Sequence, residues 1–325
     1  MSNNYIVSYA PHIQNKSSVN RIMLDVIIAL IPAFLFSVYI FGYRAALVTF
    51  VCITSCVIFE YVYEKLLKRK NTIGDFSAVL TGILLAFNLP VTIPLWQTIV
   101  GCCVAIIVVK QLFGGIGKNF ANPAITARIV MFIAFPVTMT TWVMPFDTIT
   151  GATSLAGIDS VSGATPLAHL FKGEVELMPT KLDLFLGFHG GCFGETSILA
   201  LLIGFIYLLI RRVITPVIPL TFMGTVFILT SITGGFDYGI LHLLSGGLFL
   251  GAIFCATDYV TSPLTNFGRI IFGIGCGLIT VIIRLYGSYP EGVSFAILIM
   301  NMIVPYINKL TYIKALGGKY REEKK

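Results

Sequence analysis

Long apolar runs alternate with short polar or charged breaks along most of this 325-residue chain. A helix needs about 20 mostly apolar residues to cross the hydrocarbon layer of a membrane, so these runs predict membrane segments. We expect ten of them, at residues 21–41, 45–63, 76–90, 96–113, 122–135, 195–210, 214–232, 238–256, 270–285 and 293–307. The first twenty residues are polar, and no cleavable signal peptide is expected there.

Some of these segments are short or interrupted. The segment at 76–90 has only about 15 residues and ends at Pro90, and Pro136 closes the one at 122–135. The run 81–90 also resembles 250–258, although a similarity this short can arise by chance. Short segments broken by Gly or Pro in both halves predict discontinuous helices around a central site. The expected fold is an all-α polytopic membrane protein with two pseudo-repeated halves and broken helices.

Composition supports a membrane protein. Hydrophobic residues make up 56% of the chain, charged residues only 11%, and the mean hydropathy is +0.89. Soluble domains carry about 25% charged residues, which is far more than this chain has. The net charge of +7 fits basic residues gathered in cytoplasmic loops. No continuous basic face or aromatic platform indicates a nucleic-acid partner.

The distribution of Lys and Arg predicts the orientation. Of the 22 basic residues, only Arg44, Lys172, Lys181 and Arg284 fall on the expected outer side. Positive charges favour the cytoplasmic side, so both termini are expected inside. The chain then forms one membrane domain over 1–325. Its inner ends are 1–20 and 311–325, and a polar loop at 140–181 lies outside.

The cysteines and histidines do not suggest a metal site. The cysteines form no CxxC pair, and most lie in apolar runs, where a thiol packs as a small hydrophobe. They are Cys52, Cys56, Cys102, Cys103, Cys192, Cys255 and Cys276. His169, His189 and His242 are scattered. We therefore expect neither an iron–sulfur centre nor a metal ion.

The outer loop contains a small polar stretch that ends at Thr165. A Thr at the N-cap followed by Pro166 is a favoured helix start, so Thr165 fits a cap. Unpaired N–H groups at a helix start also suit a phosphate, and the small residues Gly163 and Ala164 leave room for an approaching group. From the residues alone, a cap and a cofactor attachment point both remain open.

The stretch Asp159-x-x-Ser162-Gly163-Ala164-Thr165 resembles a flavinylation motif, in which a transferase joins FMN to the threonine through a phosphoester. Other stretches resemble the NqrB/RnfD family in the same order along the chain, and the length is closer to the RnfD branch, a membrane component of the Rnf complex, than to NqrB. The matching stretches are 10–12 with 18–23, 85–90, 119–124, 162–167, 194–197, and 256–258 with 261–263.

The resemblance implies a membrane subunit of an electron-transport complex that couples ferredoxin:NAD+ oxidoreduction to Na+ or H+ translocation. It implies covalent FMN on Thr165 as an electron carrier, a flavin transferase for maturation, and Rnf subunits A, B, C, E and G as partners. It also implies a prokaryotic inner or plasma membrane and a fold similar to urea transporters. Such a subunit has no catalytic residue of its own, and no GxGxxG motif indicates a nicotinamide site here. The alternative is a solute channel or transporter of that fold without a redox role.

Three further polar residues have two interpretations each. Asn119 and Asn122 stand beside Pro123 and can cap a helix, while the resemblance suggests a second, non-covalent flavin, such as riboflavin, near them. Asp258 lies at a segment edge, where it can contact an ion or cap the next helix. Glu195 at another edge and Asn88 inside a broken segment are weaker candidates for the same reason.

Overall fold

The computed structural model describes residues 18–69, 72–146, 153–154, 157–158, 163–174, 178–287, 289 and 291–312. The regular secondary structure of this part of the chain is helical except for a hairpin of two antiparallel two-residue strands, β1 (Thr153–Ser154) and β2 (Gly157–Ile158), inside the expected outer loop. The prediction of a helical polytopic membrane protein is confirmed, with this hairpin as a small addition.

The helices of the first half begin with two long ones and continue with shorter pieces. They are α1 (Val19–Phe41), α2 (Tyr43–Leu66), η1 (Ile73–Asp75), α3 (Ser77–Phe87), α4 (Leu95–Cys103), the π-helical η2 (Val104–Gln111), α5 (Pro123–Ala134) and α6 (Pro136–Met139).

The second half begins with two short helices on the way back into the membrane. Its helices are α7 (Pro166–Lys172), α8 (Lys181–Leu186), α9 (Ile198–Ile210), α10 (Val217–Gly234), α11 (Phe236–Leu244), α12 (Leu248–Leu250), the π-helical η4 (Gly251–Cys255), α13 (Asn266–Tyr286) and α14 (Val293–Leu310).

Helices occupy all ten expected segments, but not all are full membrane spans. Within the described residues, five helices are long and apolar enough to cross a membrane: α1, α2, α10, α13 and α14. A sixth span is formed if α11 and the α12–η4 segment count as one helix bent by 70°. The remaining apolar helices have 10–17 residues, so ten complete spans are not established. The expected break at Pro136 is present between α5 and α6.

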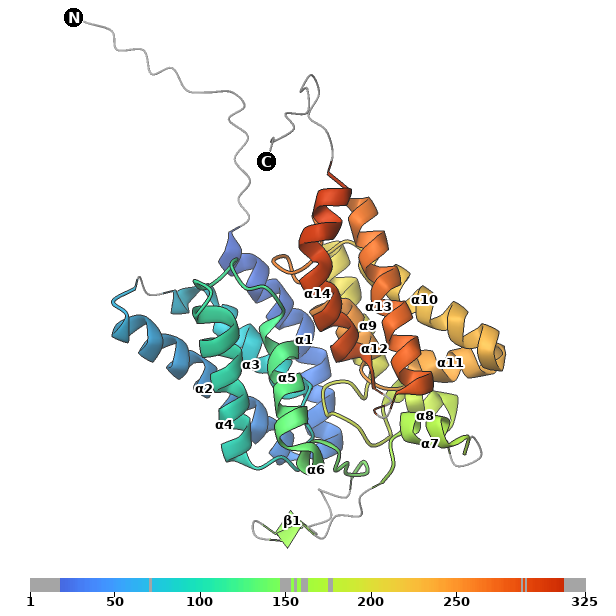
Figure 1. Ribbon diagram of the computed structural model, residues 1–325. Coiled ribbons are helices and arrows are strands. Elements are labelled where there is room, and N and C mark those ends of the chain that lie inside the picture. The colour runs from blue at the N-terminus through green and yellow to red at the C-terminus, as the bar shows by residue number, and fades with distance from the viewer. Residues whose placement is uncertain are drawn as a thin grey trace, which may run out of the picture.

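The two halves of the chain form two neighbouring groups of helices (Figure 1). Helices α2 to α6 lie on one side, α10 to α14 lie on the other, and α1 packs against α9 between them. Side-chain bonds join α1 to the second half: Ser37 Oγ donates to the carbonyl of Phe193 at 2.6 Å. The phenol of Tyr207 donates to Asp25 at 2.9 Å, and Arg211 pairs with the same carboxylate.

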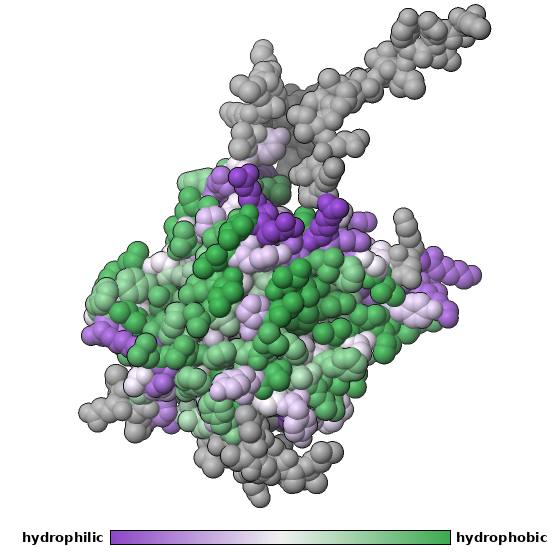
Figure 2. Space-filling model, turned by 180° about the vertical axis from the view of Figure 1, so that it is seen from behind, coloured by the Kyte–Doolittle hydropathy of each residue, from purple (hydrophilic) through white to green (hydrophobic). Residues whose placement is uncertain are grey.

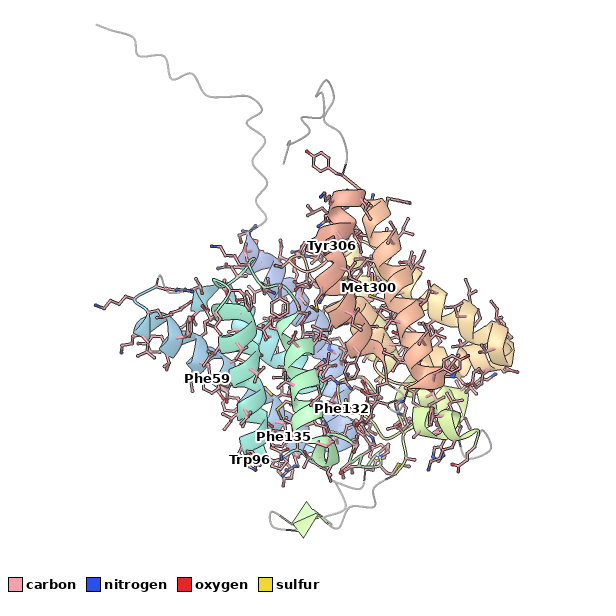
Figure 3. All side chains as sticks on the ribbon, in the orientation of Figure 1. Phe59, Trp96, Phe132, Phe135, Met300 and Tyr306 are labelled. Carbon is pink, nitrogen blue, oxygen red and sulfur yellow. The ribbon has the colours of Figure 1, made fainter. Side chains whose placement is uncertain are left out.

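The ends of the molecule are polar and its middle is apolar. Hydrophobic residues cover most of the middle in Figure 2, and hydrophilic ones gather at the end where the first helix begins. Helix α1 begins and α14 ends at this same end, whereas α7 and the β hairpin lie at the opposite end (Figure 1). Trp96 and Phe135, whose rings are 5.3 Å apart, lie toward the α7 end in Figure 3. This arrangement agrees with the prediction that the two ends of the described chain lie on the same side of the membrane.

Two details of the core refine the sequence interpretation. Cys52, Cys56 and Cys102 are buried in one place, where the Cys102 thiol donates to the carbonyl of Cys52 at 3.6 Å, as expected for packing residues. Arg284, which the sequence predicts on the outer side, is not a surface charge, because its side chain is buried with 2% exposure. It donates to the carbonyls of His242 and Ser245, near the end of α11, where the helix break leaves those oxygens unpaired.

Candidate functional site

Thr165 is the N-cap of α7, as the sequence predicted. Its backbone is extended, and its side-chain oxygen accepts the N–H of Ala168 at 3.2 Å. Pro166 follows at the first helical position, where its missing N–H costs nothing. The cap and the attachment point remain compatible, because the hydroxyl oxygen acts in the cap as an acceptor. Asp159 and Ser162, the first two residues of the flavinylation motif, lie outside the described residues.

The residues just before Thr165 pack closely on one side and are open on the other. The N–H of Gly163 donates to the carbonyl of Trp142 at 3.3 Å, and a Cβ at this glycine would lie 2.5 Å from the Met144 sulfur. A side chain at Gly163 would thus displace Met144, while Ala164 is exposed and Thr165 is partly exposed.

Helix α7 has only seven residues, so its macrodipole is small and the expectation of a phosphate-binding helix end has little support in the fold. Its apolar side faces the core: Leu167 and Leu170 are buried at 2% and 3% exposure. Leu167 packs so closely on Gly246 that a side chain there would collide with it. The α7 segment thus rests directly on the break between α11 and α12.

A second candidate site lies at the other end of the molecule. An open cavity of about 100 Å³ is bounded there by the start of α1, by α3, η2 and η4, and by the segments before α5 and after η4. Polar residues that line it include Ser77, Thr81, Lys110, Asn119, Asn122, Thr257 and Asp258. Both asparagines predicted near a second flavin therefore line the same cavity.

The two asparagines are used differently. Asn122 is the N-cap of α5, where its Oδ1 accepts from Ala124 and Ile125 at 3.0 and 3.3 Å. Its Nδ2 also donates to the carbonyl of Cys255 at 3.1 Å, which joins the two halves of the chain. Asn119 is not a helix cap and donates to the nearby carbonyl of Ala121 at 3.3 Å. Asn119 has more free hydrogen-bonding capacity toward the cavity than Asn122.

Asp258 lines the same cavity from the segment between η4 and α13, outside the spanning helices. It does not cap α13 as the sequence allowed, because Thr265 is the N-cap of that helix. Its carboxylate accepts from Thr261 Oγ1 at 3.1 Å and from Val260 N–H at 3.4 Å. Burial raises the pKa of Asp258 above its usual range.

A buried ion pair also reaches this cavity. The Lys110 ammonium, on η2, donates to Glu60 and to Ser77, both at 2.6 Å. Glu60 and Lys110 are 0% and 3% exposed, and Glu60 also accepts from Gln111 at 2.8 Å. This pair was not predicted from the sequence. The π-helical turn that brings Lys110 inward has no clear signal in the sequence, although such turns often occur at functional sites.

A third group of polar residues is buried between the two halves, where broken helices meet. Arg128 on α5 donates from Nη1 to Asn88 Oδ1 at 3.0 Å and to Ser294 Oγ at 2.9 Å. Its Nη2 contacts the Cys192 sulfur at 3.4 Å and pairs with Glu291. Asn88 and Glu195 were weak candidates in the sequence, whereas Arg128 and Glu291 were missed. For Arg128 the available signal was a charged residue inside an apolar segment, whereas Glu291 lies between two segments and had no such signal.

Comparisons with known proteins identify relatives over nearly the full length. A family model described as the NQR2, RnfD, RnfE family matches residues 6–317. The chain is 47% identical to the D subunit of the Na(+)-translocating ferredoxin:NAD(+) oxidoreductase complex of Acetobacterium woodii, and the match covers 99% of this chain and 98% of the relative.

Two other relatives are 41% identical to the chain. The D subunit of the proton-translocating ferredoxin:NAD(+) oxidoreductase complex of Clostridium ljungdahlii matches 98% of this chain and 97% of its own. The D subunit of the ion-translocating oxidoreductase complex of Stutzerimonas stutzeri matches 94% of each.

Proposed function

The chain belongs to the NQR2, RnfD, RnfE family, and from this membership we propose that it is the flavin-carrying RnfD component of an ion-translocating ferredoxin:NAD+ oxidoreductase complex. It works as one membrane subunit of a translocase and has no catalytic residue of its own. Its relatives are named for Na+ and for protons, so the family leaves the transported ion open.

The observation that carries the proposal is the position of Thr165. It lies in an accessible segment at the end of the molecule opposite to the start of α1 and the end of α14. With both termini cytoplasmic, Thr165 faces the extracytoplasmic side of the prokaryotic inner or plasma membrane, where a flavin transferase can reach it. A covalent bond retains a flavin that would otherwise be lost by dilution from an outer surface.

The bound FMN would supply the redox chemistry, and the chain's residues would hold it. Thr165 provides the hydroxyl oxygen for the phosphoester. Gly163 fixes the backbone against Trp142 and Met144, and the buried leucines of α7 anchor the segment on the core. Since α7 rests on the break between α11 and α12, the flavin is tied to the packed membrane domain. Rnf subunits A, B, C, E and G are the expected electron and assembly partners.

A denaturing gel viewed under ultraviolet light tests the attachment, with protein from cells that contain the transferase. Wild type should give a fluorescent band, and Thr165→Ala should give none. Thr165→Asn is the sharper variant, because Asn caps a helix as well as Thr but offers no hydroxyl. Intact mass should show the added FMN on wild type alone, mapped to the peptide with Thr165.

Thr180→Ala is the matched control, since Thr180 is likewise the N-cap of a short outer helix and accepts from Asp183 N–H at 3.2 Å. Its band should match wild type in brightness. A wild-type band without fluorescence, or a fluorescent band from Thr165→Asn, would contradict the covalent-flavin proposal. A dark wild-type band would also favour the alternative of a solute channel with a urea-transporter-like fold.

We also propose that the open cavity at the start of α1 holds a second, non-covalent flavin, such as riboflavin. Asn119 and Lys110 line it as hydrogen-bond donors, and apolar side chains of α1, α3 and η4 line the rest. Denaturing purified protein should release flavin beyond the covalent FMN, and Asn119→Ala should release less. Asn20→Ala, which removes an exposed amide that bonds the carbonyl of Gly74, serves as the control. Release of no flavin from wild type would end this part of the proposal.

A further inference from the structure

Glu195 is a buried carboxyl with almost no polar partners. It lies in the segment between α8 and α9 and is 4% exposed. One oxygen, Oε1, accepts the N–H of Cys192 at 3.2 Å. The other, Oε2, has no hydrogen-bond partner among the described residues and faces Gly247, at the break between α11 and α12. A charged carboxylate in this position would be poorly solvated.

The charged neighbours do not provide the missing partner. Both terminal nitrogens of Arg128 are occupied by Asn88, Ser294, Cys192 and Glu291, and those of Arg284 bond the carbonyls of His242 and Ser245. Glu291 adds a second negative charge to the cluster. The titratable and charged groups around Glu195 are His189 and Cys192 on its own segment, Arg128 of α5, His242 of α11, Arg284 of α13, and Glu291 before α14.

We propose that Glu195 holds an exchangeable proton in the folded chain, so that the central cluster contains one neutral acid. Arg128 then balances Glu291, and the guanidinium of Arg284 is held by the carbonyls of His242 and Ser245 rather than by a carboxylate. A metal ion would be a poorer choice. Although ligand atoms of Cys192, Glu195 and Glu291 lie within 4.8 Å of one another, the Arg128 guanidinium already brings a positive charge against two of them.

Glu291 offers a route for the proton. It lines a small cavity of about 10 Å³, with room for about one water molecule, together with Arg128, Phe132 and Tyr289. Glu291 is 22% exposed, so it can exchange protons with water. Carboxylate oxygens of Glu291 and Glu195 within 4.8 Å of each other can be joined by one water molecule. Glu291 is thus the outer relay and Glu195 the inner proton site.

Thermal unfolding of the full chain in lipid nanodiscs tests this from pH 4 to 8.5. An acid that binds its proton more tightly in the folded than in the unfolded chain stabilises the fold fully only below its unfolded-state pKa, about 4.3 for Glu, and loses that contribution as the pH rises. Glu195→Gln resembles the protonated acid but cannot titrate. Its melting midpoint should approach that of wild type near pH 4 and exceed it by several degrees at high pH. Glu174→Gln, at an exposed carboxylate on the outer side, should follow wild type throughout.

Two outcomes would overturn the proposal. One is a midpoint difference between wild type and Glu195→Gln that does not change with pH. The other is a midpoint difference that changes when NaCl is replaced by choline chloride at constant pH and ionic strength. Such a change would mean that Na+ occupies the site. Neither measurement requires the flavin, so protein produced without the transferase can be used. The result is therefore independent of the outcome of the Thr165 gel.

Infrared spectroscopy keeps the proposal testable if Glu195→Gln does not fold. Wild type should show the carbonyl stretch of a protonated carboxyl, shifted in D2O and lost as the pH rises. The band should persist in Glu291→Gln and change frequency in Glu195→Asp. Absence of a pH-sensitive band in wild type, or a band unmoved in Glu195→Asp, would contradict protonation of Glu195.

Discussion

The α7 segment around Thr165 and the central cluster around Arg128 obey opposite physical demands. Thr165 is partly exposed and makes one capping bond. Arg128 is 4% exposed and has four side-chain partners drawn from both halves of the chain. A modification site, as we propose for Thr165, must be reachable by another enzyme, whereas a buried charge survives only with complete pairing. Substitutions should therefore cost little stability at the first region and much at the second.

The largest effect is expected from Arg128→Leu. It leaves Glu291, which is only 22% exposed, without its partner, so the unfolding free energy should fall by about 3–5 kcal/mol. Yield of monodisperse protein and the melting midpoint would measure it. The double variant Arg128→Leu/Glu291→Leu should recover part of the loss, because both charges are then gone. A single variant as stable as wild type would contradict the importance of this pair.

Gly194→Ala should have the next largest effect. A side chain at Gly194 would collide with Phe87, at the end of α3, so the central segment could not pack as it does. We expect a loss of about 1–3 kcal/mol, measured as a shift in the denaturation midpoint. Gly224→Ala, on α10 with open space around it, should be neutral or slightly stabilising. Equal losses for both variants would mean that close packing at Gly194 does not matter.

Thr165→Ala should cost only about 1 kcal/mol, because the lost interaction is one helix cap. Thr165→Asn restores an acceptor at the same position and should be close to wild type in stability. Unfolding of chain made without the transferase isolates this contribution from that of the flavin. A loss as large as for Arg128→Leu would show that the α7 segment is part of the core, and the contrast between the two regions would then fail.

The smallest effect is expected from Lys181→Ala. It removes an outer ion pair whose side chains are 51% and 79% exposed, and such pairs contribute at most about 1 kcal/mol. Unfolding at low and high salt would measure it, and high salt should reduce the difference from wild type further. A large effect that does not depend on salt would contradict a simple surface pair.

Local features were predictable from the sequence because they depend on neighbouring residues. The positions of the helices, the caps at Thr165 and Asn122, and the break at Pro136 each rest on patterns a few residues long. The number of complete spans was not predictable in this way. An apolar run such as that of α3 looks like a membrane segment, but whether it crosses depends on what packs around its end.

The central cluster could not be predicted because its members are far apart in the chain. Arg128 and Glu291 are separated by 163 positions, and Arg128 and Asn88 by 40. No spacing rule connects such residues. Arg284 is the clearest case, since a charge near a segment end normally lies on the surface, and only the break after α11 provides the carbonyls that hold it inside.

The sequence by itself thus determined the membrane class, the order of the segments and the local geometry at Thr165, because hydrophobicity and capping are properties of short stretches. Only the tertiary structure decided which polar groups are buried together. It paired Arg128 with Glu291, left one oxygen of Glu195 without a partner among the described residues, and set α7 on the helix break beside it. The physical reason is that the burial of a charge depends on segments brought together from both halves of the chain.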